Sequence, residues 1–257
     1  MRFNQILMAA ATQGGGLGDT YIENAVDFNG STDYLSKAAD LTGNADSTTG
    51  ILSIWFRLDG GDAAVQEFIH NESDRFQANR SSSDKVVVYI ADAAGSSSFR
   101  MESSTSYTTN ATWRHLLASW DTNFSAGNKL KHLYINDAND IGTITDSSAA
   151  FTIDYTRTAW TVARFTDLSI RFFNGGLSEV YFAPGQFLDF SNSTNRRKFI
   201  DAGGKPVNLG ADGSTPTGTA PLIYLKDPAA TVGTNSGSGG DFTINGAPAT
   251  ASTTPSS

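Results

Sequence analysis

Short runs in which apolar and polar residues alternate most strongly limit what this chain can fold into. In an extended strand over residues 50–58, one face would carry the apolar side chains of Leu52, Ile54, Phe56 and Leu58. The other face would carry Ser53, Trp55 and Arg57, so the pattern predicts a half-buried strand with an aromatic ring on its outer side. Similar runs follow at residues 64–69, 76–80, 85–91, 97–102, 112–121, 130–136, 169–173 and 177–182. Clusters of Gly, Asn, Asp and Ser separate these runs, and many short strands at this spacing predict an all-β fold, a two-sheet antiparallel jelly-roll sandwich.

Composition narrows the classes of function. With 257 residues the chain is long enough for one large sandwich, and its formal net charge of -8 disfavours nucleic-acid or anionic-membrane partners, because such binding needs clustered Lys and Arg. The chain contains no Cys, so neither a disulfide nor a thiolate zinc site can form. No apolar window approaches the roughly 20 residues that span a bilayer. We therefore expect no nucleic-acid partner and no membrane insertion.

The sequence divides into a central domain and two terminal arms. Residues 1–21 join a small apolar patch to a Gly-rich stretch, which predicts a flexible arm that docks on a neighbouring subunit, and the apolar run is shorter than a signal peptide needs. Residues 22–230 form the predicted sandwich, with one short helix at about 192–201 and a closing strand at about 222–225. Residues 231–257, rich in Gly, Ser and Thr, predict a flexible C-terminal arm that is disordered unless a partner or the domain surface holds it.

Four segments carry a resemblance to a known family. They are VDFNGSTDYL at residues 26–35, WRHLLASWD at 113–121, LYIND at 133–137 and FNGGLSEVY at 173–181. In this succession they resemble the concanavalin A-like, laminin-G-like jelly-roll superfamily. Residues 199–213 and 221–225, together with the Gly-rich tail, are similar to the C-terminal part of bacteriophage and prophage virion proteins that carry this domain.

The resemblance implies a bacteriophage virion surface or tail-associated protein that is made in the host cytoplasm. It implies a non-enzymatic role, in which many copies bind host surface polysaccharide through the sandwich and contact other virion subunits, with a homo-oligomer expected. Linking weak sites raises avidity by roughly 10²–10⁴ for a pair, which makes such adhesion effective. Two alternatives stay open: a purely structural capsid-decoration or tail-joining subunit, and a glycan depolymerase.

The carboxylates do not form the pattern that a depolymerase of this family would use. Glycanases of the superfamily carry acidic residues at alternate positions on one strand, and here the glutamates are scattered at Glu23, Glu67, Glu72, Glu102 and Glu179. The nearest approximation is Glu72-Ser73-Asp74, which falls in a predicted loop. Two of the histidines, His115 and His132, fall within strand runs, where a hydrogen-bonded, partly buried imidazole is the commoner role. We therefore predict no catalytic residue.

Binding residues are predicted by chemical type. Aromatic rings stack on the apolar faces of sugars, and the candidate platforms are Trp55, Tyr107, Tyr155 and Trp160, each of which could equally pack in the core or between subunits. Calcium is the one possible cofactor, because Asp and Asn oxygens in loops suit it. Its candidate ligands are Asp27, Asn29 and Asp33 in the first turn, or Asp121 and Asn123 after the strand at 112–121. The alternative for these five residues is that their side chains form Asx turns.

Overall fold

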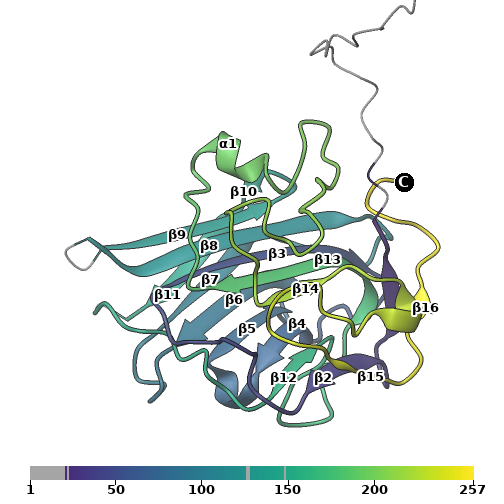
Figure 1. Cartoon of the computed structure of the whole chain (residues 1–257), viewed down its shortest axis with the longest axis horizontal. Helices are drawn as coiled ribbons and strands as arrows, with labels where there is room; N and C mark the ends of the chain where they lie inside the picture. The colour runs from purple at the N-terminus through teal and green to yellow at the C-terminus, as the bar shows by residue number, and fades with distance from the viewer. Residues whose placement is uncertain (1–20, 22, 126–127, 148) are drawn as a thin grey trace, which may run out of the picture.

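The computed structural model describes Tyr21 and residues 23–125, 128–147 and 149–257. Two antiparallel sheets are stacked face to face, which confirms the predicted all-β sandwich (Figure 1). The predicted N-terminal docking arm at residues 1–21 lies outside the described residues except for Tyr21. Within those ranges, no helix combines the length and the apolar character that a membrane crossing requires.

Each sheet contains strands from distant parts of the chain. Sheet A has the order β10 (Ala138–Asn139), β9 (Asn128–Ile135), β8 (Arg114–Ser125), β3 (Thr49–Leu58), β13 (Asn174–Pro184), β1 (Val26–Asn29) and β16 (Ala249–Thr250), and β14 (Ile223–Leu225) pairs with β13. Sheet B has the order β11 (Ile141–Asp146), β7 (Ser98–Ser106), β6 (Lys85–Ala91), β5 (Phe76–Arg80), β4 (Gln66–Asn71), β12 (Trp160–Val162), β2 (Tyr34–Lys37) and β15 (Thr243–Asn245). The described helical elements are α1 (Ser193–Arg196) and the 3₁₀ turns η1 (Glu72–Asp74) and η2 (Ala229–Thr231).

The main core lies between the two sheets, where the alternating apolar residues meet. The four apolar residues predicted for one face of β3 are all fully buried there, namely Leu52, Ile54, Phe56 and Leu58. Phe56 meets Phe68 of β4 with ring centroids 5.0 Å apart, and Phe76 of β5 stacks on Phe182 of β13 at 4.3 Å. Aromatic contacts of this kind add to the free energy gained by burying apolar area.

A second core covers the outer face of sheet A. The chain between β13 and β14, which includes α1, folds back over that face (Figure 1). This second cluster consists of Ile51, Leu117, Tyr134, Tyr181, Ala183, Phe190, Phe199, Leu209 and Tyr224. The prediction that Trp55 lies on an outer, solvent-facing side of β3 is wrong, because Trp55 is only 3% exposed and stacks on His115 of β8.

The helix predicted at about 192–201 is present but shorter. α1 begins after Asn192, whose side chain accepts the Thr194 backbone N–H, and it ends at Arg196. Beyond it the backbone continues in turn-like bonds, such as the one from the Phe199 N–H to the Arg196 carbonyl. The closing strand predicted at 222–225 is β14.

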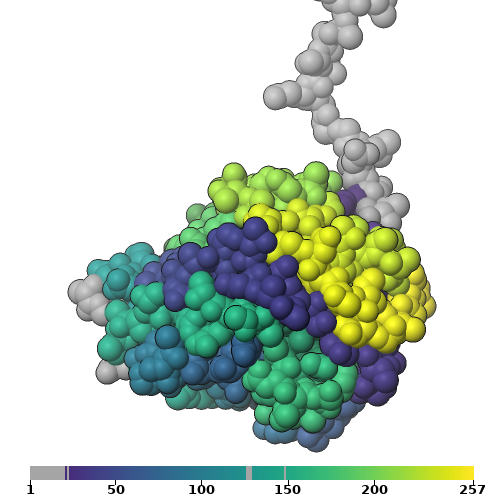
Figure 2. All heavy atoms as spheres, turned by 60° about the horizontal axis from the view of Figure 1, so that its bottom comes forward, coloured from purple at the N-terminus to yellow at the C-terminus, as the bar shows by residue number. Residues whose placement is uncertain are grey.

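The C-terminal segment, residues 231–257, is part of the domain and not a flexible arm. β15 pairs with β2 in sheet B and β16 pairs with β1 in sheet A, so this segment joins both sheets. Phe242 is buried in the main core, and the Asn235 side chain bonds the Leu222 carbonyl and the Tyr224 N–H. In Figure 2 the yellow C-terminal residues lie against the purple segment near the start of the chain. The surface that orders this segment is thus the domain's own.

Candidate functional site

The register of sheet B places two rows of side chains side by side on its outer face. Residues paired across antiparallel strands point to the same side of a sheet. The first row crosses β4, β5, β6 and β7 through His70, Gln77, Tyr89 and Arg100. The second row crosses the same strands through Glu67, Asn79, Val87 and Glu102. Polar groups therefore gather on the face opposite the core.

The residues that these rows take from β5 and β6, together with Arg100 of β7, line a hollow of about 340 Å³, which we call the sheet B groove. Its lining consists of Val65, Gln77, Asn79, Ser81, Ser82, Val87, Tyr89, Arg100 and Arg171. The Asn79 Nδ2 donates to Gln77 Oε1 at 2.8 Å, so each amide holds the other in position. Among the described residues, no group accepts a hydrogen bond from the Gln77 NH₂ group, and none donates one to the Asn79 carbonyl oxygen. One aromatic ring, two amides and two guanidinium groups thus share one open hollow.

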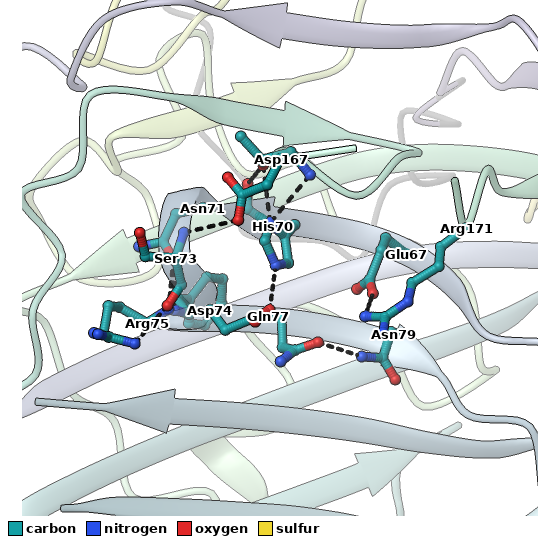
Figure 3. A network of polar contacts seen from close by, with 12 residues as sticks. Glu67, His70, Asn71, Ser73, Asp74, Arg75, Gln77, Asn79, Asp167 and Arg171 are labelled. Carbon is teal, nitrogen blue, oxygen red and sulfur yellow. Dashed lines mark hydrogen bonds and ion pairs between the residues drawn. The ribbon is translucent and has the colours of Figure 1, made fainter. Parts of the chain in front are cut away.

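The loop 163–173 supplies Arg171 to this groove. The sequence predicts a strand at 169–173, but the segment is a loop in which Arg171 has a φ of 56° and its carbonyl accepts the Glu67 backbone N–H at 3.0 Å. The Arg171 guanidinium lies 4.5 Å from the Phe165 ring centroid, and its Nη1 donates to Glu67 Oε1 at 3.3 Å (Figure 3). The loop therefore fixes Arg171 from its backbone to its tip.

Glu67 is fully buried beneath this loop. Burial raises the pKa of its carboxyl group to about 8, and the nearby Arg171 opposes the rise without cancelling it. Its Oε2 has no hydrogen-bond partner among the described residues. At neutral pH the Glu67 carboxyl group is therefore mostly protonated and uncharged.

His70 lies on the same face in a network of its own (Figure 3). Its Nε2 lies 2.8 Å from Asp74 Oδ1, and its Nδ1 accepts the Thr166 backbone N–H at 3.3 Å. This hydrogen bond lowers the pKa of Asp74, although partial burial opposes it. The segment Glu72-Ser73-Asp74 is the 3₁₀ turn η1 between β4 and β5, as the loop prediction requires. Glu72 accepts the Thr158 hydroxyl at 2.5 Å, so its carboxyl group and that of Asp74 serve different partners.

Three of the four predicted sugar platforms lie in the interior. Trp55 stacks on His115 with ring centroids 4.6 Å apart, and Tyr155 and Trp160 are fully buried in the main core. A ring without exposed area cannot meet a sugar, so these three predictions are wrong. Tyr107 is half-buried, its hydroxyl donates to Asp140 Oδ2 at 2.5 Å, and it does not line the groove.

The predicted calcium ligands are engaged with the protein itself. Asn29 Oδ1 accepts the N–H groups of the next turn at 2.9–3.2 Å, and Asp121 Oδ1 accepts the Asn123 N–H at 2.9 Å. Asp27 pairs with Arg57 at 2.8 Å, and Asp33 Oδ1 accepts the Ala247 N–H at 2.9 Å. In the part of the chain that the structure describes, no three His, Asp or Glu side chains gather in a way that could hold a metal ion. The geometry of Asn29 and Asp121 matches the Asx-turn alternative.

Sequence reasoning missed Tyr89 and also Trp113 as candidate binding residues. Tyr89 is half-buried at the groove, and the alternation within residues 85–91 already places it opposite Val88 and Ile90. Trp113 borders a second hollow of about 400 Å³, which the C-terminal segment completes. The Trp113 Nε1–H donates to Thr253 Oγ1 at 3.1 Å, so its polar atom already has a partner.

Comparison with known proteins supports the fold. No family model and no curated protein matches the sequence. A candidate carbohydrate-binding protein from Bacteroides ovatus has a similar solved structure, with 14% identity and a TM-score of 0.61, over 90% of this chain and 61% of that one. A pentraxin from Limulus polyphemus has 10% identity and a TM-score of 0.47, over 66% of this chain and 79% of its own. A CBM40 domain of a Ruminococcus gnavus sialidase, bound to sialyllactose, has 10% identity and a TM-score of 0.45, over 66% and 94%.

The similarity to the Bacteroides protein concerns the architecture. The chain spans about three fifths of the length of the Bacteroides protein, and at such low identity the likeness concerns the fold. Together with the strand order of the two sheets, it assigns the chain a two-sheet jelly-roll fold.

Proposed function

We propose that the chain is a non-catalytic glycan-binding protein whose binding site is the sheet B groove. The observation that carries this proposal is the placement of Tyr89 beside the fixed amides of Gln77 and Asn79 in one open hollow. A sugar ring can lie on the tyrosine face while amide and guanidinium groups bind its hydroxyls. The lectin-like fold is compatible with this role.

The carboxyl groups near the groove favour binding over hydrolysis. Glu67 pairs with Arg171, Glu102 with Arg100 and Asp74 with His70. A glycosidase needs one carboxyl group as the acid and a second as the base or nucleophile, placed on either side of a bond. A glycan depolymerase therefore stays the enzymatic alternative, and the release of new reducing ends from a bound polysaccharide would reveal it.

The biological setting that we propose is the bacteriophage virion, with a host surface polysaccharide as the ligand. This part of the proposal rests on the resemblance of the sequence, in particular of its C-terminal residues. Many copies on one particle would convert weak single-site contacts into stable adhesion. A purely structural decoration or joining subunit is the alternative.

The Tyr89→Ala variant tests the site. We expect it to weaken binding to host envelope polysaccharide at least tenfold, because it removes the aromatic platform, and we expect a calcium chelator to have no effect. Phe124→Ala is the matched control, since Phe124 is an exposed aromatic residue (54%) on β8 of the other sheet. Equal losses in both variants would refute the site. Absence of binding by the folded wild-type protein would favour the structural alternative.

A further inference from the structure

We infer that the ligand of the sheet B groove is an anionic saccharide, whose carboxylate or sulfate group is bound by Arg171 together with Arg100. This inference rests on the proposed function and adds the chemical class of the ligand.

The charges that line the groove are positive, in contrast with the chain as a whole. Arg100 and Arg171 line the hollow, and its lining includes no Asp or Glu. The whole chain has a formal net charge of -8. A cationic hollow on an acidic protein attracts anionic ligands and discriminates among saccharides by charge.

Arg171 keeps its positive charge available for a ligand. The one carboxyl group within 4 Å of its guanidinium among the described residues is that of Glu67, which burial holds mostly in the protonated, uncharged form at neutral pH. Asp74, the other carboxylate whose field reaches Glu67, is hydrogen-bonded to His70 Nε2 at 2.8 Å. Arg100 differs, because Glu102 beside it neutralises part of its charge. We therefore assign the larger share of anion binding to Arg171.

Arg171 is also held in place before any ligand arrives. The ring of Phe165 packs against its guanidinium, and its own carbonyl oxygen anchors the loop to β4. About a third of its side chain (36%) stays exposed and accessible. A planar guanidinium binds the two oxygens of a carboxylate or sulfate at once, and an ordered side chain loses less entropy on binding.

An array of saccharides in matched pairs tests the inference. Each acidic member is paired with its carboxyl-reduced or desulfated counterpart, and binding is measured with the full chain. We expect the bound members to be acidic and their uncharged counterparts to bind at least tenfold more weakly. Uronate and sulfate members distinguish the two kinds of anionic group.

Two variants and one control complete the test. Arg171→Gln should weaken binding of acidic members at least tenfold, and Arg100→Gln should weaken it less. Arg197→Gln is the control, because Arg197 is equally exposed (37%) and also pairs with a carboxylate, that of Asp137. Thermal unfolding of each variant identifies any loss of fold, and Arg100→Gln keeps the loop contacts of Arg171 intact.

The outcomes separate the inference from the proposed function. Binding of neutral members that Tyr89→Ala abolishes and Arg171→Gln leaves unchanged would overturn the anionic ligand and leave glycan binding in place. Binding of acidic members that is unaffected by Tyr89→Ala and by Arg171→Gln would overturn the groove as the site. Absence of binding across the array would overturn both.

Discussion

Glu67 should make the stability of this protein depend on pH. Its folded-state pKa of about 8 lies above the ordinary value of 4.5, so between these values the unfolded chain releases a proton that the folded protein retains. Stability is therefore lost as pH rises from about 4.5 to 8. We expect Glu67→Gln, which mimics the protonated form, to gain on the order of a few kcal/mol over wild type at pH 8 and little at pH 4.5. Urea unfolding at both pH values measures this, with Glu72→Gln as the control. An equal effect at both values would contradict the explanation.

Gly175 shows why the FNGGLSEVY motif needs its glycines. Its φ is 154°, and a Cβ at this position would overlap the carbonyl oxygen of Arg57 on the neighbouring strand β3. We expect Gly175→Ala to cost on the order of 3 kcal/mol or more in free energy of unfolding, because backbone must move. Gly43→Ala is the control: its φ is also positive (75°), but a Cβ there would meet no atom within 4 Å. The control should lose only about 1 kcal/mol. Similar losses in the two variants would mean that backbone conformation alone sets the cost.

At the scale of elements, the segments that carry the family resemblance and the proposed site belong to different sheets. β1, β8, β9 and β13, which contain most of those segments, all lie in sheet A. Their succession predicted the fold correctly. The groove lies on sheet B. The only part of those segments that reaches sheet B is the end of residues 26–35, in β2, so the resemblance gave no information about the groove.

The alternation along a strand predicted burial better than it predicted which aromatic residues are exposed. In β6, Tyr89 falls on the face opposite Val86, Val88 and Ile90, and this phase alone would have identified it. Trp55 has the corresponding outward phase in β3, yet it is buried and stacks on His115 of the neighbouring strand β8. The side of a strand to which a residue points can be derived from the sequence. Whether another segment covers that side cannot, because this depends on contacts between residues that are distant in the chain.

The C-terminal segment should be as important to stability as the central strands. Phe242 is 6% exposed and belongs to the main core, between β15 and the body of the domain. We expect Phe242→Ala to cost about 3–5 kcal/mol, because it removes a buried ring and leaves a cavity. Thr243→Ala, at the exposed neighbouring position, should stay within about 0.5 kcal/mol. Urea unfolding of the two variants measures this difference. If the C-terminal segment were peripheral to the fold, the two variants would have equal stability.

At the scale of the whole molecule, composition was a poor guide to order. The same Gly, Ser and Thr content that suggested a flexible arm in residues 231–257 is found in a segment whose two short strands pair with both sheets. Two well-placed apolar residues, Phe242 and Val232, and the hydrogen bonds of Asn235 are enough to hold that segment on the domain. In the sequence these residues look isolated, because the residues that they contact lie far away along the chain.

Buried ionisable groups together predict an acidic optimum of stability. Burial raises the pKa of Glu179 to about 7, as it raises that of Glu67, and it lowers the pKa of His115 to about 3. Glu67, Glu179 and, to a smaller extent, Asp27 destabilise the fold as pH rises above the ordinary carboxyl range of about 4. His115 and, to a smaller extent, His132 destabilise it as pH falls below about 6.5. Between these values the three carboxyl groups outweigh the two histidines, and below them hydrogen-bonded aspartates such as Asp137 also lose their stabilising charge. We therefore expect maximum stability near about pH 5.

A double variant tests whether the two glutamates set this optimum. The double variant Glu67→Gln/Glu179→Gln lacks the two carboxyl groups whose ionisation destabilises the fold as pH rises. The buried His115 should then move the maximum of the unfolding free energy above about pH 6.5. Guanidinium unfolding of both proteins at pH 3.5 to 8.5 measures the two maxima. A wild-type maximum above pH 7, or an unchanged maximum in the double variant, would show that these carboxyl groups ionise freely inside the fold. In that case Arg171 would be neutralised by Glu67, and the groove would lose the charge on which anion binding depends.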